Sequence, residues 1–367
     1  MNRAFFIMQP FSYTGACRVA LDIASELIET KDYKPENIHL ISPSIEDDRL
    51  VNELANCAYS MHNNISGLNI APDDFVLLNT SAILGEYANP IFEMLGNGSL
   101  KKAFWFIHEN NLIHLKNFEG IRENITHLLK IGLLEIFAPS QECAELISKY
   151  FGNMHIQPIQ LFVDPSGNSV QRYSDDFSHL DFYISGNPSD GRKGQILFYT
   201  ALQTAYYKHL KKHPGDYRSF TIHLTTVGNS WISQTIKILA KATPEIEFQL
   251  YPPVSFQDAQ RIQKTCNVTV CTSLSESFAL YIAEGMTMGH VLLRNNTADY
   301  KNQIEDGING FLFEMHDFNE LVEKIELILN LKKTSNEKLL QMSEESVKMV
   351  TPFTHKNYLE QFSYKPE

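Results

Sequence analysis

The chain has 367 residues, of which 43% are hydrophobic and 20% are charged, and its formal net charge is −12. This length favours two domains over one, and the composition is typical of a soluble globular protein with a sizeable core. The acidic balance argues against a nucleic-acid partner and makes contact with anionic membrane lipid weak or absent.

Further classes of protein are excluded by what the sequence lacks. No apolar run is as long as a membrane span, and the apolar part of the N-terminus is too short for a signal peptide. The five cysteines and 13 histidines are dispersed, without the spacing of a zinc or redox motif. We therefore expect a cytoplasmic protein, at most peripheral to the inner face of the membrane, with neither a metal nor a cofactor.

In residues 1–165, short apolar runs alternate with amphipathic stretches. The runs are typical of buried parallel strands and cover Ala4–Met8, Asn37–Ile41, Phe75–Leu78, Ala103–Ile107 and Glu135–Ala138. Amphipathic helices are expected at Ala16–Ile28 and Gln141–Tyr150. This alternation predicts an α/β domain with a parallel sheet.

Residues 166–178 are polar and aperiodic and read as a linker to a second domain at residues 179–350. Its expected strands are Phe182–Ser185, Thr221–Thr225, Ile246–Leu250, Val268–Cys271 and Val291–Leu293. Its expected helices are Gln195–His209, Ser230–Ala242, Phe256–Lys264, Ala279–Met288, Asn319–Leu329 and Glu337–Met349. A last segment, 351–367, begins near Pro352, which should end a helix.

The predicted fold class is α/β, with two Rossmann-like doubly wound domains facing a cleft. Ligands of such sheets bind outside the carboxyl ends of the strands. One candidate is Gly15, which follows the first strand and allows a phosphate to approach a helix N-terminus. A simple strand-to-helix turn explains Gly15 equally well, and the absence of G-x-G-x-x-G counts against a dinucleotide-dependent dehydrogenase.

A second candidate is the loop GNPSDGRKG, which runs from Gly186 to Gly194. Arg192 and Lys193 precede a predicted helix, where cations oppose the helix dipole unless an anion such as a diphosphate lies between them. A solvated turn with two exposed charges is the alternative.

Two glutamates mark the third candidate. Glu276 precedes a predicted helix, where a carboxylate suits the dipole, and Ser275 or Ser277 would cap that helix. Glu284 lies inside a nearly all-apolar helix, where a carboxylate needs hydrogen-bond donors such as the two hydroxyls of a ribose. His108 ends the strand at Ala103–Ile107; it is placed to donate to a substrate oxygen, although a structural histidine is the commoner case.

Together these residues resemble the retaining glycosyltransferases of the GT-B fold, most closely glycosyltransferase family 4. That family's pattern is E-x-F-G-x-x-x-x-E-A-M-x-x-G-x-P-V followed by D-G-x-N-G-x-L. The chain reads ESFALYIAEGMTMGHV at 276–291 and DGINGFL at 306–312. The basic loop, with Gly186, Arg192, Lys193 and Gly194, is similar to the family's G-R-x-(x)n-R-K-G. The resemblance spans most of the chain, thinly before residue 100.

The resemblance implies a hexosyltransferase that uses a nucleotide diphosphate sugar, without metal, in bacterial-type polysaccharide or glycoconjugate synthesis. Lys193 and Arg192 would neutralise the diphosphate, Glu284 would hold the ribose, and Glu276 would face the sugar. The backbone of Ser277, Phe278, Ala279 and Leu280, as a helix N-terminus, would add N–H groups. Gly15 would approach the donor, and His108 would lie near sugar and acceptor. The last segment, 351–367, would cross back to the first domain, as it does in that family.

The chain departs from the family pattern at Asn187, Ala279 and His290, and residues 158–164 lack the usual Asn-Gly. The acceptor stays open among a glycan, a lipid-linked molecule and a protein. Two alternatives to the transferase remain: a catalytically silent partner subunit of the same fold, and a nucleotide-sugar epimerase.

Overall fold

The computed structural model describes residues 2–12, 14–46, 48–110, 112–164, 179–186, 191–217, 220–225, 230–297, 303–334, 336–362 and 364. The chain divides into two compact units. Unit 1 comprises Met1–Phe162 and Lys356–Glu367, and unit 2 comprises Val163–His355. The expected linker, 166–178, and the departure at Asn187 lie outside the described residues.

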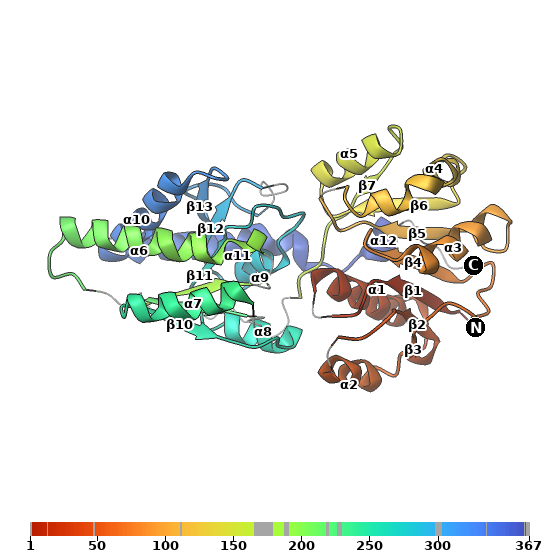
Figure 1. The fold of residues 1–367 in the computed structure, drawn as a ribbon, viewed down its shortest axis with the longest axis horizontal. Helices are drawn as coiled ribbons and strands as arrows, with labels where there is room; N and C mark the ends of the chain where they lie inside the picture. Colours follow the sequence, from red (N-terminus) through yellow and green to blue (C-terminus); the bar gives the residue numbers. More distant parts are fainter. Residues whose placement is uncertain are drawn as a thin grey trace. The chain divides into compact units, whose positions relative to one another are not determined.

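Unit 1 is built on a parallel sheet of seven strands, in the order β3-β2-β1-β4-β5-β6-β7 (Figure 1). The strands are β1 (Ala4–Met8), β2 (Ile38–Ile41), β3 (Ser60–His62), β4 (Phe75–Asn79), β5 (Ala103–Phe106), β6 (Leu134–Ala138) and β7 (Gln157–Pro158). All residues of β1, β4 and β5 are buried, as expected of strands that are covered on both faces.

Helices cover both faces of this sheet. The elements are α1 (Gly15–Lys31), η1 (Pro35–Asn37), α2 (Asp48–Asn56), α3 (Gly85–Gly96), η2 (Leu115–Ile121), α4 (Arg122–Lys130), α5 (Gln141–Tyr150) and α12 (Tyr358–Gln361). Helix α1 begins where the Thr14 hydroxyl accepts a hydrogen bond from Cys17 N at 3.4 Å, and α5 begins where Ser140 caps Cys143 N at 3.2 Å. One core cluster joins alternate strand residues to α3, α4 and α5.

The last residues of the chain complete the other face of unit 1. Phe362 stacks on Phe104 and Phe137, with ring centroids 5.6 and 4.4 Å apart. The buried Glu26 carboxylate of α1 accepts hydrogen bonds from Tyr358 N at 2.8 Å and Leu359 N at 3.2 Å. The terminal segment is therefore part of the core of unit 1.

Unit 2 repeats this plan with a six-stranded parallel sheet, in the order β10-β9-β8-β11-β12-β13. The strands are β8 (Leu180–Ile184), β9 (Phe220–Leu224), β10 (Ile246–Leu250), β11 (Val268–Cys271), β12 (Val291–Asn295) and β13 (Gly310–Phe313). In both sheets the strand order reverses next to the first strand, between β1 and β4 and between β8 and β11. Each reversal is a topological switch point, where doubly wound sheets bind ligands.

The helices of unit 2 also lie on both faces of its sheet (Figure 1). The elements are η3 (Gly191–Lys193), α6 (Gln195–Lys212), α7 (Trp231–Ala242), α8 (Phe256–Gln263), α9 (Leu280–Thr287), α10 (Phe318–Thr334), α11 (Asn336–Val350) and η5 (Thr351–Thr354). Helices α6 and α10 pack together, and α9 packs on α11. Helix α11 ends two residues before Pro352, which opens a 3-10 turn. No described helix has the length and hydropathy of a bilayer-spanning segment.

The predicted doubly wound α/β class is confirmed, and most predicted strands and helices lie within a few residues of the observed ones. The short strands β3 and β7 were not predicted, because two or three residues give no readable alternation. Strand β13 was also missed, since its residues were assigned to the D-G-x-N-G-x-L motif alone.

Candidate active site

The basic loop of unit 2 meets the first glutamate at the switch point between β8 and β11. Lys193 Nζ donates a hydrogen bond to Glu276 Oε1 at 2.6 Å, and Arg192 Nη1 lies 3.8 Å from the same oxygen. The side chains of Lys193 and Glu276 are only 15% and 10% exposed, so this pair is screened far less than a surface ion pair. The structure thus brings together two neighbouring cations of the predicted site and a carboxylate that lies 83 positions after Lys193 in the chain.

The backbone of the loop is fastened to the end of β11. The Thr272 hydroxyl lies 3.1 Å from Lys193 O and 2.9 Å from Gly194 O, and Leu274 N donates to Arg192 O at 2.8 Å. Arg192 Nη1 also donates to Ser275 O. In both Arg192 and Lys193, the backbone carbonyl and the charged end of the side chain are hydrogen-bonded within the protein. The fold therefore fixes the positions of the two cations.

Two glycines allow the basic loop to approach the segment after β11 closely. A Cβ on Gly186 would lie 2.8 Å from Lys193 Cε, so a side chain there would displace the lysine stem. A Cβ on Gly194 would lie 2.4 Å from Thr272 O, and Gly194 also has a φ of 70°, which favours glycine. Gly186, with a φ of 114°, and Gly194 are therefore favoured by packing and by backbone conformation, whereas a Cβ on Gly191, the third glycine of the loop, would make only an ordinary contact.

The charge state of Glu276 follows from these neighbours. Burial raises the pKa of the Glu276 carboxyl, but the Lys193 ammonium and the Arg192 guanidinium outweigh burial and hold that pKa below its ordinary value. Glu276 is thus an anion at neutral pH. The site combines two cations and one anion, which can bind a diphosphate next to a group that carries hydroxyls.

Helix α9 begins later than predicted. Its first residue is Leu280 and its N-cap is Ala279, without a side-chain cap, so neither Ser275 nor Ser277 caps it. Ser277 and the buried Phe278 lie in the preceding loop, and Phe278 packs on Phe353 with ring centroids 5.4 Å apart. The predicted helix N-terminus at Ser277–Leu280 is therefore restricted to Ala279 and Leu280.

Glu284 lies on α9 and is half-buried, as its surroundings in the sequence suggested. Gln260 Nε2 donates to Glu284 Oε1 at 3.3 Å. Glu284 is the fifth residue of α9 and therefore lies just over one turn into the helix.

The D-G-x-N-G-x-L motif and His290 have structural roles in unit 2. Asp306 Oδ1 accepts from Leu312 N at 2.8 Å, and a Cβ on Gly310 would lie 2.2 Å from Leu292 O, so this motif forms the tight entry into β13. His290, where the family has proline, is buried and bonds Thr269 Oγ1 through Nδ1 at 2.7 Å. Burial lowers the pKa of His290 to about 3, so the ring is neutral.

Unit 1 has its own polar group at the switch point between β1 and β4. Asn79, the last residue of β4, donates through Nδ2 to Ala16 O at 3.0 Å, and its Oδ1 lies 2.8 Å from His108 Nε2. Asn79 thus joins the turn at Gly15, the first residue of α1, to His108, which follows β5. Burial lowers the pKa of His108 to about 3, so this histidine is neutral at neutral pH.

The residue after His108 stabilises the same edge of the sheet. The Glu109 carboxylate accepts from Ser81 N at 2.9 Å, from Ser81 Oγ at 2.7 Å and from the Thr80 hydroxyl. Thr80 has a φ of 81°, which is costly for a β-branched residue and persists only where the surroundings impose it. The strain lies beside a candidate site residue.

Lys193, Arg192 and Glu276 therefore form one group in unit 2, and Asn79 joins His108 to the turn at Gly15 in unit 1. Sequence reasoning missed Thr272, which fastens the basic loop within unit 2, and Asn79. Each is a polar residue at the end of an apolar strand, and this position was the available signal. Among the described residues, no cluster of three or more His, Cys, Asp or Glu side chains has the arrangement of a metal site.

Unit 2 is similar in sequence to a known protein family. Residues 187–349 match the family model named glycosyl transferases group 1, and this stretch holds the basic loop, Glu276 and Glu284. A segment of 94 residues is 33% identical to an uncharacterised glycosyltransferase of Methanocaldococcus jannaschii and covers 25% of this chain. The chain spans about a quarter of that relative's length, 27%.

Solved structures resemble the whole chain. HepE of Anabaena in complex with UDP has a TM-score of 0.70 at 13% identity, over 98% of each chain. The chain has the GT-B fold. A glycosyltransferase from Rickettsia africae has a TM-score of 0.67 at 13% identity, over 99% of this chain and 100% of that one. HepE was also solved with UDP and glucose and with UDP-glucose.

Proposed function

We propose that the protein is a retaining glycosyltransferase that moves a hexose-like sugar from a nucleotide diphosphate to an acceptor hydroxyl. The observation that carries this proposal is the cluster of Lys193, Arg192 and Glu276, with Nζ–Oε1 at 2.6 Å, at the switch point of unit 2. The cluster lies inside the stretch that matches the group 1 model. The ligands of HepE make a UDP sugar the first donor to test.

The roles follow from charge and position. Lys193 and Arg192 would bind the diphosphate, and Glu276, already an anion between them, would accept from sugar hydroxyls. Glu284 would accept from the ribose hydroxyls, in the place where Gln260 now donates to it. The backbone N–H groups at Ala279 and Leu280 would complete the donor site.

The reaction would proceed on one face of the sugar. The bond between the anomeric carbon and the diphosphate oxygen breaks, and the electron pair leaves with the diphosphate, where Lys193 and Arg192 stabilise the charge. The acceptor oxygen bonds to the same face of the anomeric carbon, and its proton passes to the departing diphosphate. The donor and acceptor must be held in this geometry for the step to be fast.

Unit 1 would supply Gly15 and His108 to this reaction. The neutral His108 ring donates its one N–H to Asn79 Oδ1, so its Nδ1 can accept a hydrogen bond from a sugar hydroxyl without adding charge. We place the activity in glycan or glycoconjugate synthesis, because the group 1 match concerns sugar transfer.

Thermal unfolding with UDP, GDP, ADP or NAD tests the donor site. A ligand that binds only the folded protein raises the melting temperature. We expect UDP to stabilise the wild type, Glu284→Ala to lose that effect, and Glu323→Ala, which removes an exposed carboxylate of α10, to retain it. Absence of any shift at millimolar nucleotide would contradict a working donor site.

Metal removal tests whether Lys193 and Arg192 alone neutralise the charge of the diphosphate. If Lys193 and Arg192 carry the charge of the diphosphate, EDTA leaves turnover unchanged. Turnover that is lost with EDTA and restored by a divalent cation would show that they do not suffice.

A further inference from the structure

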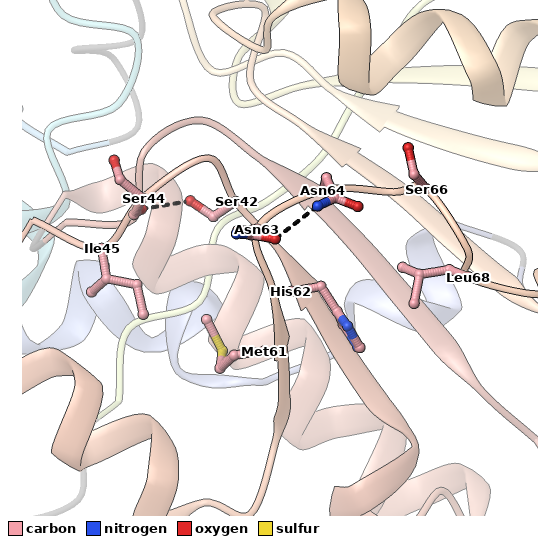
Figure 2. Close-up of a pocket in the computed structure, with 9 residues that line it drawn as sticks. All are labelled: Ser42, Ser44, Ile45, Met61, His62, Asn63, Asn64, Ser66 and Leu68. Carbon is pink, nitrogen blue, oxygen red and sulfur yellow. Dashed lines mark hydrogen bonds between the residues drawn. The ribbon is translucent and has the colours of Figure 1, made fainter.

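A cavity of about 400 Å³ opens in unit 1, away from the groups described above (Figure 2). It is lined in part by Ser42, which follows β2, and by Asn63, which follows β3. It therefore lies at the carboxyl edge of the sheet, where doubly wound domains bind ligands. Its volume falls in the range of small-molecule sites.

The lining is uncharged. None of the nine described residues that line the cavity is a Lys, Arg, Asp or Glu. His62 is paired with His39, Nε2 to Nδ1 at 3.0 Å, and burial lowers the pKa of both rings, so His62 is neutral at neutral pH. A phosphate, a carboxylate or an ammonium group would find no counter-charge in this lining, which disfavours charged ligands.

The polar groups match hydroxyls. Carboxamides and hydroxyls both donate and accept, as each hydroxyl of a sugar does. Asn64 Nδ2 donates to Asn63 Oδ1 at 2.8 Å, which leaves most of the capacity of the two amides for a ligand. Ser42 Oγ lies 2.9 Å from Gln9 O and 2.8 Å from Ser44 O, so its proton is used and its oxygen can only accept.

The cavity also has an apolar wall and a fixed frame. Ile45, Met61 and Leu68 contribute the apolar part, which suits the C–H face of a sugar ring. The Asn63 backbone is fixed because Tyr87 OH donates to Asn63 O at 2.9 Å. Holding the backbone at Asn63 in this way lowers the entropy that this part of the site loses on binding.

We propose that this cavity binds a neutral sugar unit of the acceptor. The inference rests on the proposed transferase function and narrows the acceptor to an uncharged glycan. The uncharged lining argues against a lipid phosphate or an acidic polysaccharide as the group that binds here.

The test is binding of the full chain to an array of neutral oligosaccharides, uronic-acid oligosaccharides, sugar phosphates and peptides. We expect a neutral oligosaccharide to bind. The double variant Asn63→Ala/Asn64→Ala should lose about tenfold in affinity, since it removes the ligand's hydrogen-bond partners. Ser66→Phe, which fills the cavity and keeps both amides, should lose as much. Asn124→Ala, an exposed change on α4, should match the wild type.

The UDP melting shift, recorded on the same proteins, separates the two proposals. If UDP raises the melting temperature normally but no neutral glycan binds, the proposal for the cavity is overturned and the transferase proposal stands. If a neutral glycan binds, the cavity variants weaken that binding and UDP gives no melting shift, the cavity is a glycan site and the transferase proposal is overturned. Binding confined to charged glycans or peptides, or neutral-glycan binding that neither variant changes, overturns the inference.

Discussion

The two sheets have the same strand order, but their switch points carry opposite kinds of chemistry. In unit 2 the point between β8 and β11 is bridged by an ion pair, Lys193 with Glu276, 2.6 Å apart. In unit 1 the point between β1 and β4 is bridged by neutral groups, with Asn79 between Ala16 O and His108. Both sheets have a switch point at the carboxyl ends of their strands. The residues of the loops at that edge determine whether it carries charged or neutral groups.

This contrast bears on the proposed reaction, in which the donor carries charge and the proposed acceptor unit is neutral. A nucleotide diphosphate needs cations, which only the unit 2 group provides among the groups described at these two edges. A neutral acceptor needs hydroxyls and amides, which line the unit 1 cavity. The predictions below test whether this division of charge is functional.

The largest effect is expected from removing the half-buried cation Lys193. Lys193→Ala should lower turnover by about 10²–10³-fold, the usual cost of deleting a group that stabilises developing charge. Lys211→Ala, an exposed change on α6 of the same unit, is the control and should retain activity. Steady-state kinetics and circular dichroism make the comparison. Full activity in Lys193→Ala would remove the charged site from the mechanism.

The next effect concerns the anion of the pair. Glu276→Gln removes a carboxylate that competes with a diphosphate for Lys193, so UDP affinity should rise about three- to tenfold while turnover falls. Calorimetric titration with UDP measures the first change, and Glu323→Gln serves as the control. Weaker UDP binding in Glu276→Gln would mean that Glu276 positions Lys193 rather than competing for it.

Glu276 also predicts a pH dependence of stability. The folded pKa of this carboxyl lies below its ordinary value, so its contribution to stability is complete above about pH 4.5 and is lost as the pH falls through the folded pKa. Urea unfolding below about pH 4.5 should therefore show a smaller acid loss in Glu276→Gln than in the wild type. Parallel losses in the two proteins would refute this assignment.

The neutral state of His108, at the switch point of unit 1, predicts that this histidine does not titrate near neutral pH. His108 has a pKa lowered to about 3, so the ring stays neutral as the pH falls through its ordinary value of about 6.5. The pH profile of kcat/KM should show no acid limb from this group near pH 6.5, in the wild type or in the exposed control His155→Gln. An acid limb near that pH that disappears in His108→Gln would show that His108 is protonated during catalysis.

The smallest effect tests the strain beside His108. Thr80 has a φ of 81°, so Thr80→Gly should be at least as stable as Thr80→Ala, because both lose the hydroxyl but only alanine keeps a strained Cβ. In helix α4, Thr126→Ala should be more stable than Thr126→Gly by about 1 kcal/mol, the ordinary order. Urea unfolding compares the four variants, and the ordinary order at position 80 would contradict imposed strain.

Much of the charged site was predictable because its motifs are local. The pattern ESFALYIAEGMTMGHV and the Arg192–Lys193 loop can be read from neighbouring residues. The start of α9 was misplaced by one residue, because neither Ser275 nor Ser277 caps it and the chain instead enters the helix at Ala279. The neutral cavity could not be predicted, since its lining joins loops after β2 and β3, and β3 has only three residues.

By itself the sequence determined the alternation of strands and helices and the presence of a basic loop and two glutamates. These are properties of short windows, in which apolar periodicity and capping residues act between neighbours. Only the tertiary structure decided that Lys193 pairs with Glu276, that Gly186 leaves room for the lysine stem, and that Asn79 joins Ala16 to His108. The physical reason is the crossover between non-consecutive parallel strands, which brings their carboxyl ends together at the switch point and which no local pattern encodes.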